Sequence, residues 1–316
     1  MIVSIKKILK TSIPLIFGAV LVWYSLSKIS INVLIGYFKE ANYEWIFLGL
    51  FFGILSHLSR AYRWKFMLDP LGFKPRFTNS VLAVLVGYLV NLAIPRAGEV
   101  SRAFVLTNYE QIPFEKGFGT IVAERIADLV MMLCIIIITL FVQFDFIYDL
   151  LTKNFDASKI SIGLIILIII CYILYFFVKK ATSGILLKIK TFVIGLVEGV
   201  TSIFRMKNKV AFIFHTIFIW VMYVAMFWAT IPAISGLEVP FGGVLIGFIA
   251  GGFSIAATNG GIGLYPIAVA GALALFDIPS DPATAFGWIM WTAQTAMIII
   301  FGGLAFLFLP IYNKHK

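Results

Sequence analysis

The residues best suited to chemistry are charged side chains that gather between Arg60 and Asp128. They lie in three motifs, S59-R-A-Y-R-W-K, N91-L-A-I-P-R-A-G-E-V-S-R and A123-E-R-I-A-D. The candidate substrate-binding residues are Arg60, Arg63, Asn91, Arg96, Glu99, Arg102, Glu124, Arg125 and Asp128. A guanidinium group presents a planar fork of donors that matches phosphate oxygens, and a carboxylate pairs with such a group or with a cationic moiety. The residue types therefore indicate a site for an anionic group such as a phosphate.

The charges of these motifs nearly balance, with a small positive excess. The second and third motifs each alternate arginine with acid and together supply three charges of either sign, whereas Arg60 and Arg63 add two positive charges. Backbone amides freed at the break between Pro95 and Gly98 would strengthen an anion site. A structural alternative stays open, in which the charges fasten a broken helix to its neighbour and the arginines of the first motif anchor the chain at lipid headgroups.

A second, uncharged group of candidates lies in the motif A257-T-N-G-G-I-G. Thr258 and Asn259 offer neutral hydrogen-bonding groups, and the glycines permit close backbone approach or positive φ. Gln294, in the last apolar segment, is added because a buried amide needs a partner. The glycines of this group are Gly260, Gly261 and Gly263. Helix packing is the alternative role for such a glycine cluster.

The elements that must position these residues are membrane helices. Of 316 residues, 61% are hydrophobic and only 13% are charged, which excludes an ordinary soluble enzyme. We therefore expect an all-α polytopic membrane protein with one transmembrane domain over residues 1–316. Apolar runs predict six full spans, at about 11–27, 45–59 with an extension to Leu68, 117–142, 160–178, 210–234 and 286–309. The first run is interpreted as an uncleaved span, and the two cysteines lie within apolar runs and indicate neither a disulfide nor a metal site.

Two further apolar stretches, about 80–100 and 241–276, are interrupted by Asn, Pro and Gly and predict broken helices. If each enters and leaves on one side, 20 of the 25 Lys and Arg residues share the side of both termini, and four lie opposite. That asymmetry favours re-entrant elements from opposite faces and cytoplasmic termini in a bacterial-type inner (plasma) membrane. Aligning Asn91 with Ser254 also pairs Gly98 with Gly261, as expected for an inverted repeat. Most of the net charge of +10 is then explained by basic residues that mark the cytoplasmic side of the membrane. We therefore expect no nucleic-acid partner.

Residues 183–204 differ from the spans, because polar side chains recur every three or four positions among apolar ones. This pattern is typical of an amphipathic helix in the membrane interface, and we expect it on the cytoplasmic side with an architectural role.

The motifs R60-x-x-R-W, N91-x-x-x-P-R-A-G-E-x-x-R, E124-R-x-x-D and G260-G-I-G resemble the lysylphosphatidylglycerol synthase transmembrane (flippase-like) family over essentially the whole chain. The resemblance implies a domain that, in bifunctional relatives, translocates an aminoacylated phospholipid made by a fused synthase. This chain ends at Lys316 and so resembles a stand-alone member without the aminoacyl-transferring domain. Some stand-alone relatives are labelled as dolichol-phosphate or glycolipid proteins, which leaves the lipid class open.

One departure from the family pattern limits what carries over. Many members have a Pro before the second Gly-Gly and an acid after the G-G-x-G, where this chain has Asn259 and Pro266. A role of that acid in recognising a cationic headgroup is therefore not transferred.

The sequence as a whole predicts a lipid translocase that binds an anionic or zwitterionic phospholipid, or a polyprenyl-phosphate-type lipid, without cofactor or metal. No nucleotide-binding loop is present, so movement would be passive or driven by an ion gradient or the membrane potential. Two alternatives remain: an intramembrane enzyme acting on a lipid phosphate, and a lipid-binding partner of a separate lipid-modifying enzyme, such as a synthase or glycosyltransferase. As a translocase, the protein is not expected to be an enzyme itself.

Overall fold

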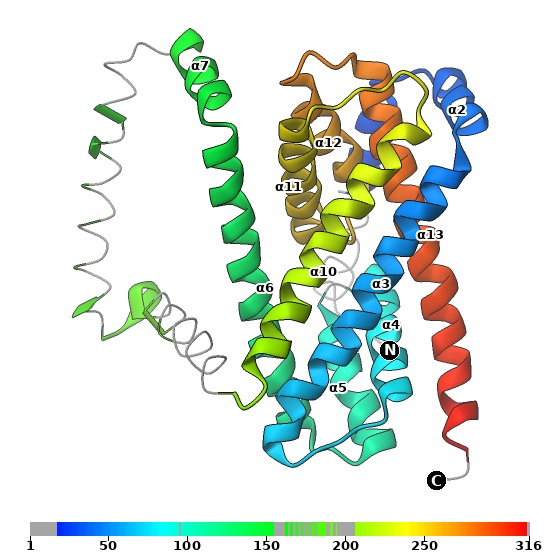
Figure 1. Ribbon diagram of the computed structural model, residues 1–316, viewed down its shortest axis with the longest axis vertical. Helices are drawn as coiled ribbons and strands as arrows, with labels where there is room; N and C mark the ends of the chain where they lie inside the picture. Colours follow the sequence, from blue (N-terminus) through cyan, green and yellow to red (C-terminus); the bar gives the residue numbers. More distant parts are fainter. Residues whose placement is uncertain are drawn as a thin grey trace, which may run out of the picture. The chain divides into compact units, whose positions relative to one another are not determined.

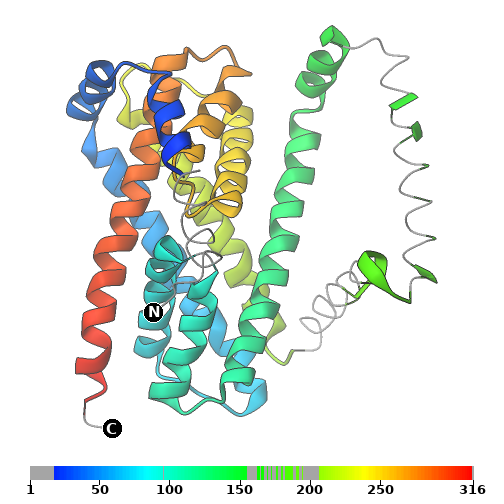
Figure 2. The same ribbon diagram turned by 180° about the vertical axis from the view of Figure 1, so that it is seen from behind.

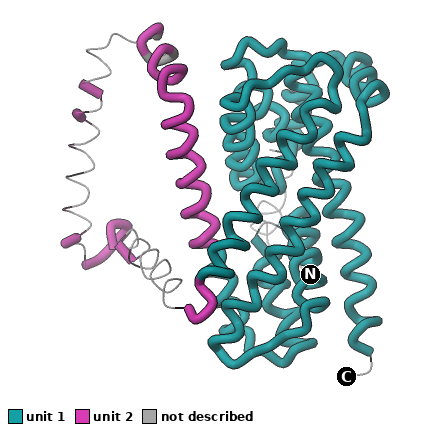
Figure 3. Tube along the Cα trace, viewed as in Figure 1, with its two compact units in different colours: residues 1–124, 210–316 teal, residues 125–209 magenta. Residues whose placement is uncertain are grey.

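The structure is a computed structural model that describes residues 18–94, 96–154 and 206–314, together with scattered positions between 162 and 194. All regular secondary structure in this part of the chain is helical. The chain divides into two compact units, one made of Met1–Glu124 and Val210–Lys316 and the other of Arg125–Lys209 (Figure 3). Each unit is described by itself below.

Four helices are long and apolar enough to cross a membrane, which makes the chain an all-α polytopic membrane protein. They are α3 (Tyr43–Leu68), α6 (Phe114–Val142), α10 (Lys209–Thr230) and α13 (Ser280–Tyr312). The predicted spans 45–68, 117–142, 210–234 and 286–309 are thereby confirmed. Short 3-10 turns, η1 (Asp69–Leu71) and η2 (Ile231–Ala233), extend α3 and α10.

The remaining predicted elements outside the two broken helices are only partly described. A helix over Gly18–Leu26 is bent by 83° from α2 (Ile31–Glu40), and the two together form a fifth candidate span. The start of the predicted span 11–27 lies outside the described residues, as do most of the span 160–178 and of the interfacial helix 183–204. The second unit also contains α7 (Phe144–Asn154).

The first broken segment forms a helical hairpin of α4 (Phe77–Ala93) and α5 (Ala97–Glu110) (Figure 1). The two helices lie close together because glycine occupies both sides of the contact. A Cβ on Gly98 would lie 2.6 Å from Asn91 Cγ and still closer to the Gly87 carbonyl oxygen, and one on Gly87 would lie 2.6 Å from Arg102 Cγ. At the turn, Arg96 adopts φ 61°, a left-handed conformation. The hairpin is longer than the predicted 80–100, because α5 continues as a regular helix to Glu110.

The second broken segment forms a matching hairpin of α11 (Phe241–Ala257) and α12 (Leu264–Ala274). Its turn over residues 258–263 contains three glycines with positive φ, of 61° at Gly260, 82° at Gly261 and 69° at Gly263. These angles confirm the expectation of positive φ at the glycines. A residue with a Cβ would be strained in this conformation. Gly263 also allows the helix Gly18–Leu26 to approach, since a Cβ there would lie 2.5 Å from Val22 N.

Both hairpins pack against helix α13 (Figures 1 and 2). Its first half packs on α12, where a Cβ on Gly287 would lie 2.7 Å from Pro266 Cα. Its second half packs on α4, where a Cβ on Gly302 would lie 2.8 Å from Leu89 Cβ. Small residues at these two contacts let the helix backbones come together, as is common in membrane helices.

The two hairpins run toward each other along α13. Helix α4 begins near the end of α13, where Asn79 Nδ2 donates to Asn313 Oδ1 at 3.0 Å. The turns meet near the middle of α13, since a Cβ on Gly260 would lie 2.7 Å from Leu92 Cδ2 and Trp291 Nε1 donates to the Gly260 carbonyl oxygen at 2.8 Å. Helices α4 and α11 thus point in opposite directions, in the manner expected of an inverted repeat. Re-entry of the hairpins from opposite membrane faces stays a prediction.

Candidate functional site

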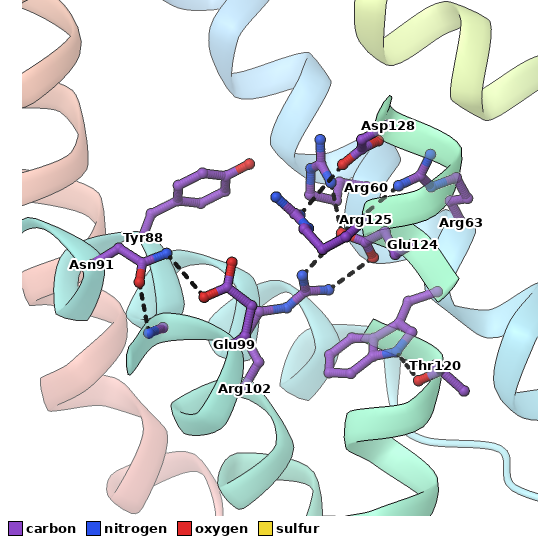
Figure 4. A network of polar contacts seen from close by, with 12 residues as sticks. Arg60, Arg63, Tyr88, Asn91, Glu99, Arg102, Thr120, Glu124, Arg125 and Asp128 are labelled. Atoms are coloured by element: carbon purple, nitrogen blue, oxygen red, sulfur yellow. Dashed lines mark hydrogen bonds and ion pairs between the residues drawn. The ribbon is translucent and has the colours of Figure 1, made fainter. Parts of the chain in front are cut away.

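The centre of the site is the carboxylate of Glu124 on α6, which lies among three arginines (Figure 4). Arg60 Nη1 donates to Glu124 Oε1 at 2.6 Å. Arg102 makes a bidentate pair, with Nη1 to Oε1 at 2.9 Å and Nη2 to Oε2 at 3.1 Å. Arg63 Nη2 lies 3.7 Å from Oε1. All four side chains are at most 5% exposed, so this arginine–glutamate cluster is buried.

Segments of three helices within the first unit build this cluster, and α6 contributes its part up to Glu124. Arg60 and Arg63 are three residues apart on α3 and therefore lie on one face of it. Arg102 lies on α5, within about two turns of the hairpin tip, and Glu124 lies on α6. The sequence motifs predicted this grouping, and the structure brings these four residues together as expected.

Neighbouring side chains hold the guanidinium groups in position. Arg63 Nη1 donates to Thr216 Oγ1 at 3.0 Å, and Arg102 Cζ lies 4.4 Å from the centre of the Trp64 ring. Trp64 in turn donates from Nε1 to Thr120 Oγ1 at 2.8 Å. The only local sequence signal for these three supporting residues is the position of Trp64 directly after Arg63.

The cluster is suited to anion binding. Its four members carry three positive charges and one negative charge, all removed from water. Buried charges are costly unless they are paired and hydrogen-bonded, so such a concentration of arginine is rarely kept within membrane helices without a function. Each forked guanidinium that now faces a carboxylate has the geometry to face a phosphate instead.

The tip of the first hairpin is held by Asn91 and exposes Arg96. Asn91 Oδ1 accepts from the Gly98 backbone N–H at 2.7 Å, which caps the start of α5, and its Nδ2 lies 3.5 Å from Glu99 Oε2. Arg96 is exposed, and no ion pair or side-chain hydrogen bond joins it to another described residue. The tip therefore presents an accessible cation at the start of the helix that carries Arg102. Pro95 lies outside the described residues.

Arg125 and Asp128 belong to the second unit. Arg125 Nη2 lies 3.4 Å from Asp128 Oδ2, and the two side chains are 42% and 12% exposed. The two residues are three apart in the sequence and therefore lie on one face of α6. Their participation in the substrate site stays a prediction.

The second hairpin tip is organised by local hydrogen bonds. Thr258 Oγ1 donates to the Ser254 carbonyl oxygen at 2.8 Å, and Gln294 Nε2 donates to the Met290 carbonyl oxygen at 3.2 Å. Gln294 also forms a side-chain hydrogen bond with Tyr265 of α12, and Trp291 reaches the glycine turn through Gly260. Asn259 lies in the same turn.

A row of polar aromatic side chains adjoins the arginine–glutamate cluster. Arg60 Nη2 lies 3.4 Å from Tyr223 OH, which is hydrogen-bonded to Tyr88 OH at 3.1 Å. The Tyr88 ring centre lies 4.4 Å from that of His57. Sequence reasoning missed both tyrosines because each stands alone in an apolar run, and only the fold places them together.

The described residues contain no group of three or more His, Cys, Asp or Glu side chains arranged to hold a metal ion.

Comparison with known proteins gives a family match and two partial relatives. A family model described as "Lysylphosphatidylglycerol synthase TM region" matches residues 12–302. The chain is 33% identical over 125 residues to the UPF0104 membrane protein MJ1595 of Methanocaldococcus jannaschii, covering 39% of this chain and 37% of that protein. It is 31% identical over 77 residues to the glycosyltransferase AglD of Haloferax volcanii, covering 24% of this chain and 12% of that protein. No solved structure matches.

Proposed function

Because the chain belongs to the family of lysylphosphatidylglycerol synthase transmembrane regions, we propose that it moves a lipid with a phosphate-containing headgroup across the membrane. A lipid-related membrane function follows from the family. The step to translocation is carried by one observation: three buried arginines converge on Glu124 next to a hairpin whose tip exposes Arg96. The matched stretches are only 37% and 12% of the two named relatives, so the lipid is inferred from the chemistry of this site.

The proposed mechanism is an exchange of partners on the arginines. A phosphate first meets Arg96 at the hairpin tip. It then displaces the Glu124 carboxylate from Arg102, whose two donors fit two phosphate oxygens equally well. The displaced Glu124 carboxylate still lies beside Arg60 and Arg63, so it does not become an isolated buried charge. Such an exchange avoids the large cost of leaving a buried charge unpaired.

The opposed hairpins support a path through the middle of the membrane. Their tips meet at Leu92 and Gly260, so contact between the two tips would close this path. Separation of the tips would join the two halves of the path, which is how broken-helix transporters give access to a central site. Passive exchange and coupling to an ion gradient or the membrane potential are both compatible with this path.

The proposed orientation places the basic end of the first unit in the cytoplasm of a plasma membrane. This end contains the last turn of α3 and the α3–α4 connection, with Lys65, Lys74 and Arg76. Positively charged loops are retained on the cytoplasmic side. The lipid partners are then an anionic or zwitterionic phospholipid or a polyprenyl-phosphate-type lipid, supplied by a separate lipid-modifying enzyme.

Replacement of Arg96 tests the proposal without disturbing the buried cluster. In vesicles containing the purified protein and a fluorescent phosphatidylglycerol, we expect Arg96→Gln to slow exchange between leaflets at least about tenfold, since a charged hydrogen bond contributes about 1.5–3 kcal/mol. Lys116→Gln, at an exposed position in the first turn of α6, is the matched control and keeps the wild-type rate. Equal rates for Arg96→Gln and the wild type would contradict the mechanism.

The similarity to the Haloferax volcanii glycosyltransferase supports a second candidate function, an enzyme acting on a lipid phosphate or a lipid-binding partner of a glycosyltransferase. Product formation from polyprenyl phosphate by the purified chain would favour the enzyme. Lipid binding without exchange between leaflets would favour the binding partner.

A further inference from the structure

An apolar groove and a polar pocket lie next to each other on the first unit, where α3 ends and α4 begins. The groove has a volume of about 270 Å³, and its lining includes Leu55, Leu58, Phe214 and Phe218. The pocket has a volume of about 380 Å³, and its lining includes Lys65, Asp69 and Lys74. Tyr62 and Phe77 line both cavities, so the groove continues into the pocket. Volumes of this size are near the lower end of the usual range for small-molecule sites, about 300–1,000 Å³.

The groove–pocket pair is separate from the arginine–glutamate cluster. Arg60 and Arg63 are buried in the interior, whereas Leu58 and Tyr62 are 37% and 40% exposed on another face of α3. A hydrogen bond of 2.8 Å between Ser59 Oγ and His215 Nδ1 joins α3 to α10 in the groove lining. A ligand of the groove is therefore not the ligand proposed for the cluster.

The charges of the pocket favour an anion. Two lysines line it against one carboxylate, that of Asp69. Both lysines are exposed, neither forms an ion pair with another described residue, and Lys65 Nζ lies 5.9 Å from the centre of the Tyr62 ring. Lysine and tyrosine together are typical of the level of the lipid headgroups. The pocket thus offers a positive, water-accessible end to an otherwise apolar groove.

The length of the groove fits one leaflet of a bilayer. From Leu55 to Lys65 is ten residues of α3, or roughly 15 Å at 1.5 Å per residue. This is about half of the ~30 Å hydrocarbon core. A chain that starts at the lysines and follows the groove would therefore end near the bilayer midplane.

We propose that the groove–pocket pair binds one anionic phospholipid of the adjoining leaflet, with an acyl chain along Leu55, Leu58 and Phe218 and the phosphate at Lys65 and Lys74. The binding stabilises the α3–α4–α10 contact from outside, independently of lipid movement through the interior. The proposal does not depend on translocation, so it can fail while the proposed function stands, and the reverse.

Lipid binding to the purified full-length chain, followed by native mass spectrometry, tests the headgroup half of the site. The probes are dioleoyl phosphatidylglycerol and dioleoyl phosphatidylcholine. We expect K65Q/K74Q to weaken phosphatidylglycerol binding by roughly fivefold for each lysine and to leave phosphatidylcholine binding unchanged. The matched control is K28Q/K39Q, which also removes two lysines, one of them (Lys28) 4.7 Å from a tyrosine ring, in the segment of the chain from the first helix to α2. Equal phosphatidylglycerol affinities in the wild type and K65Q/K74Q would overturn the proposal.

Filling the groove tests the acyl-chain half. We expect Leu58→Trp to weaken binding of dioleoyl phosphatidylglycerol and to leave binding of the dihexanoyl lipid, which is too short to follow the groove, unchanged. Ile137→Trp, at an exposed position on α6, is the control. Glycerol phosphate should not displace the bound lipid. Unchanged dioleoyl binding in Leu58→Trp, or full displacement by glycerol phosphate, would overturn the assignment to a lipid.

Discussion

At the scale of single residues, Glu124 is the side chain on which the site depends. Its two oxygens accept from Arg60 and Arg102, and Arg63 lies close by, all within the protein interior. The sequence could predict that these charges belong together, because their motifs are compact and a charge within a membrane span requires a partner. It could not predict that Trp64, Thr120 and Thr216 would support them, because those contacts join helices far apart in the chain.

We expect Glu124→Gln to destabilise the protein strongly. Neutralising the shared carboxylate leaves buried guanidinium groups without that counter-charge, and removing one partner of a buried ion pair costs about 3–5 kcal/mol. Glu115→Gln, in the exposed first turn of the same helix, is the control. Thermal unfolding in detergent should show a large fall in the midpoint for Glu124→Gln alone. Equal midpoints for the two variants would show that the carboxylate does not hold the cluster.

At the scale of elements, the two hairpins are the feature that positions the site. Pro and Gly in apolar runs were enough to predict that 80–100 and 241–276 would break, since each residue type interrupts a regular helix. The exact hairpin bounds were not predictable, and α2, bent by 83° from the preceding helix, was missed. Such bends depend on packing against distant residues, as with Gly263 beside Val22, which leaves no local signal in the sequence.

Alanine at Gly98 should damage the first hairpin. Its Cβ would collide with Asn91 and with the backbone of Gly87, and backbone atoms cannot move aside as a flexible side chain can. We expect a loss of about 1–3 kcal/mol, the usual cost of overpacking. Gly119→Ala on α6 is the matched substitution, because a Cβ there meets nothing within 4 Å. It should be neutral or stabilise by up to about 1 kcal/mol. If unfolding measurements gave equal effects for both variants, the close α4–α5 contact would be wrong.

At the scale of the whole molecule, the distribution of basic residues favours the predicted topology with two re-entrant hairpins. Four of the six predicted spans are confirmed, whereas the start of the span 11–27 and most of the span 160–178 lie outside the described residues. Hydropathy suffices for long spans because the bilayer sets their length and apolarity. Hydropathy alone does not show on which side a short hairpin leaves the membrane, so the side of each connection has to be measured.

Single cysteines flanking each hairpin test that topology. In a chain with Cys134 and Cys171 replaced by serine, we expect Lys74→Cys and Glu115→Cys, before and after the first hairpin, to react with an impermeant maleimide from the cytoplasmic side. Glu238→Cys and Ser280→Cys, on either side of the second hairpin, should react from the opposite side. All four positions are exposed. Reaction of the two members of either pair from opposite sides would mean that the hairpin crosses the membrane.

The central claim is that this chain by itself carries a phospholipid across a bilayer. The most direct measurement is the fraction of a fluorescent phosphatidylglycerol that dithionite can quench in vesicles containing only the purified wild-type protein. Translocation predicts that the quenched fraction rises from the outer-leaflet share to nearly all of the lipid, with protein-free vesicles remaining at the outer-leaflet share. A quenched fraction equal to that of protein-free vesicles, with protein shown to be folded and inserted, would contradict the claim.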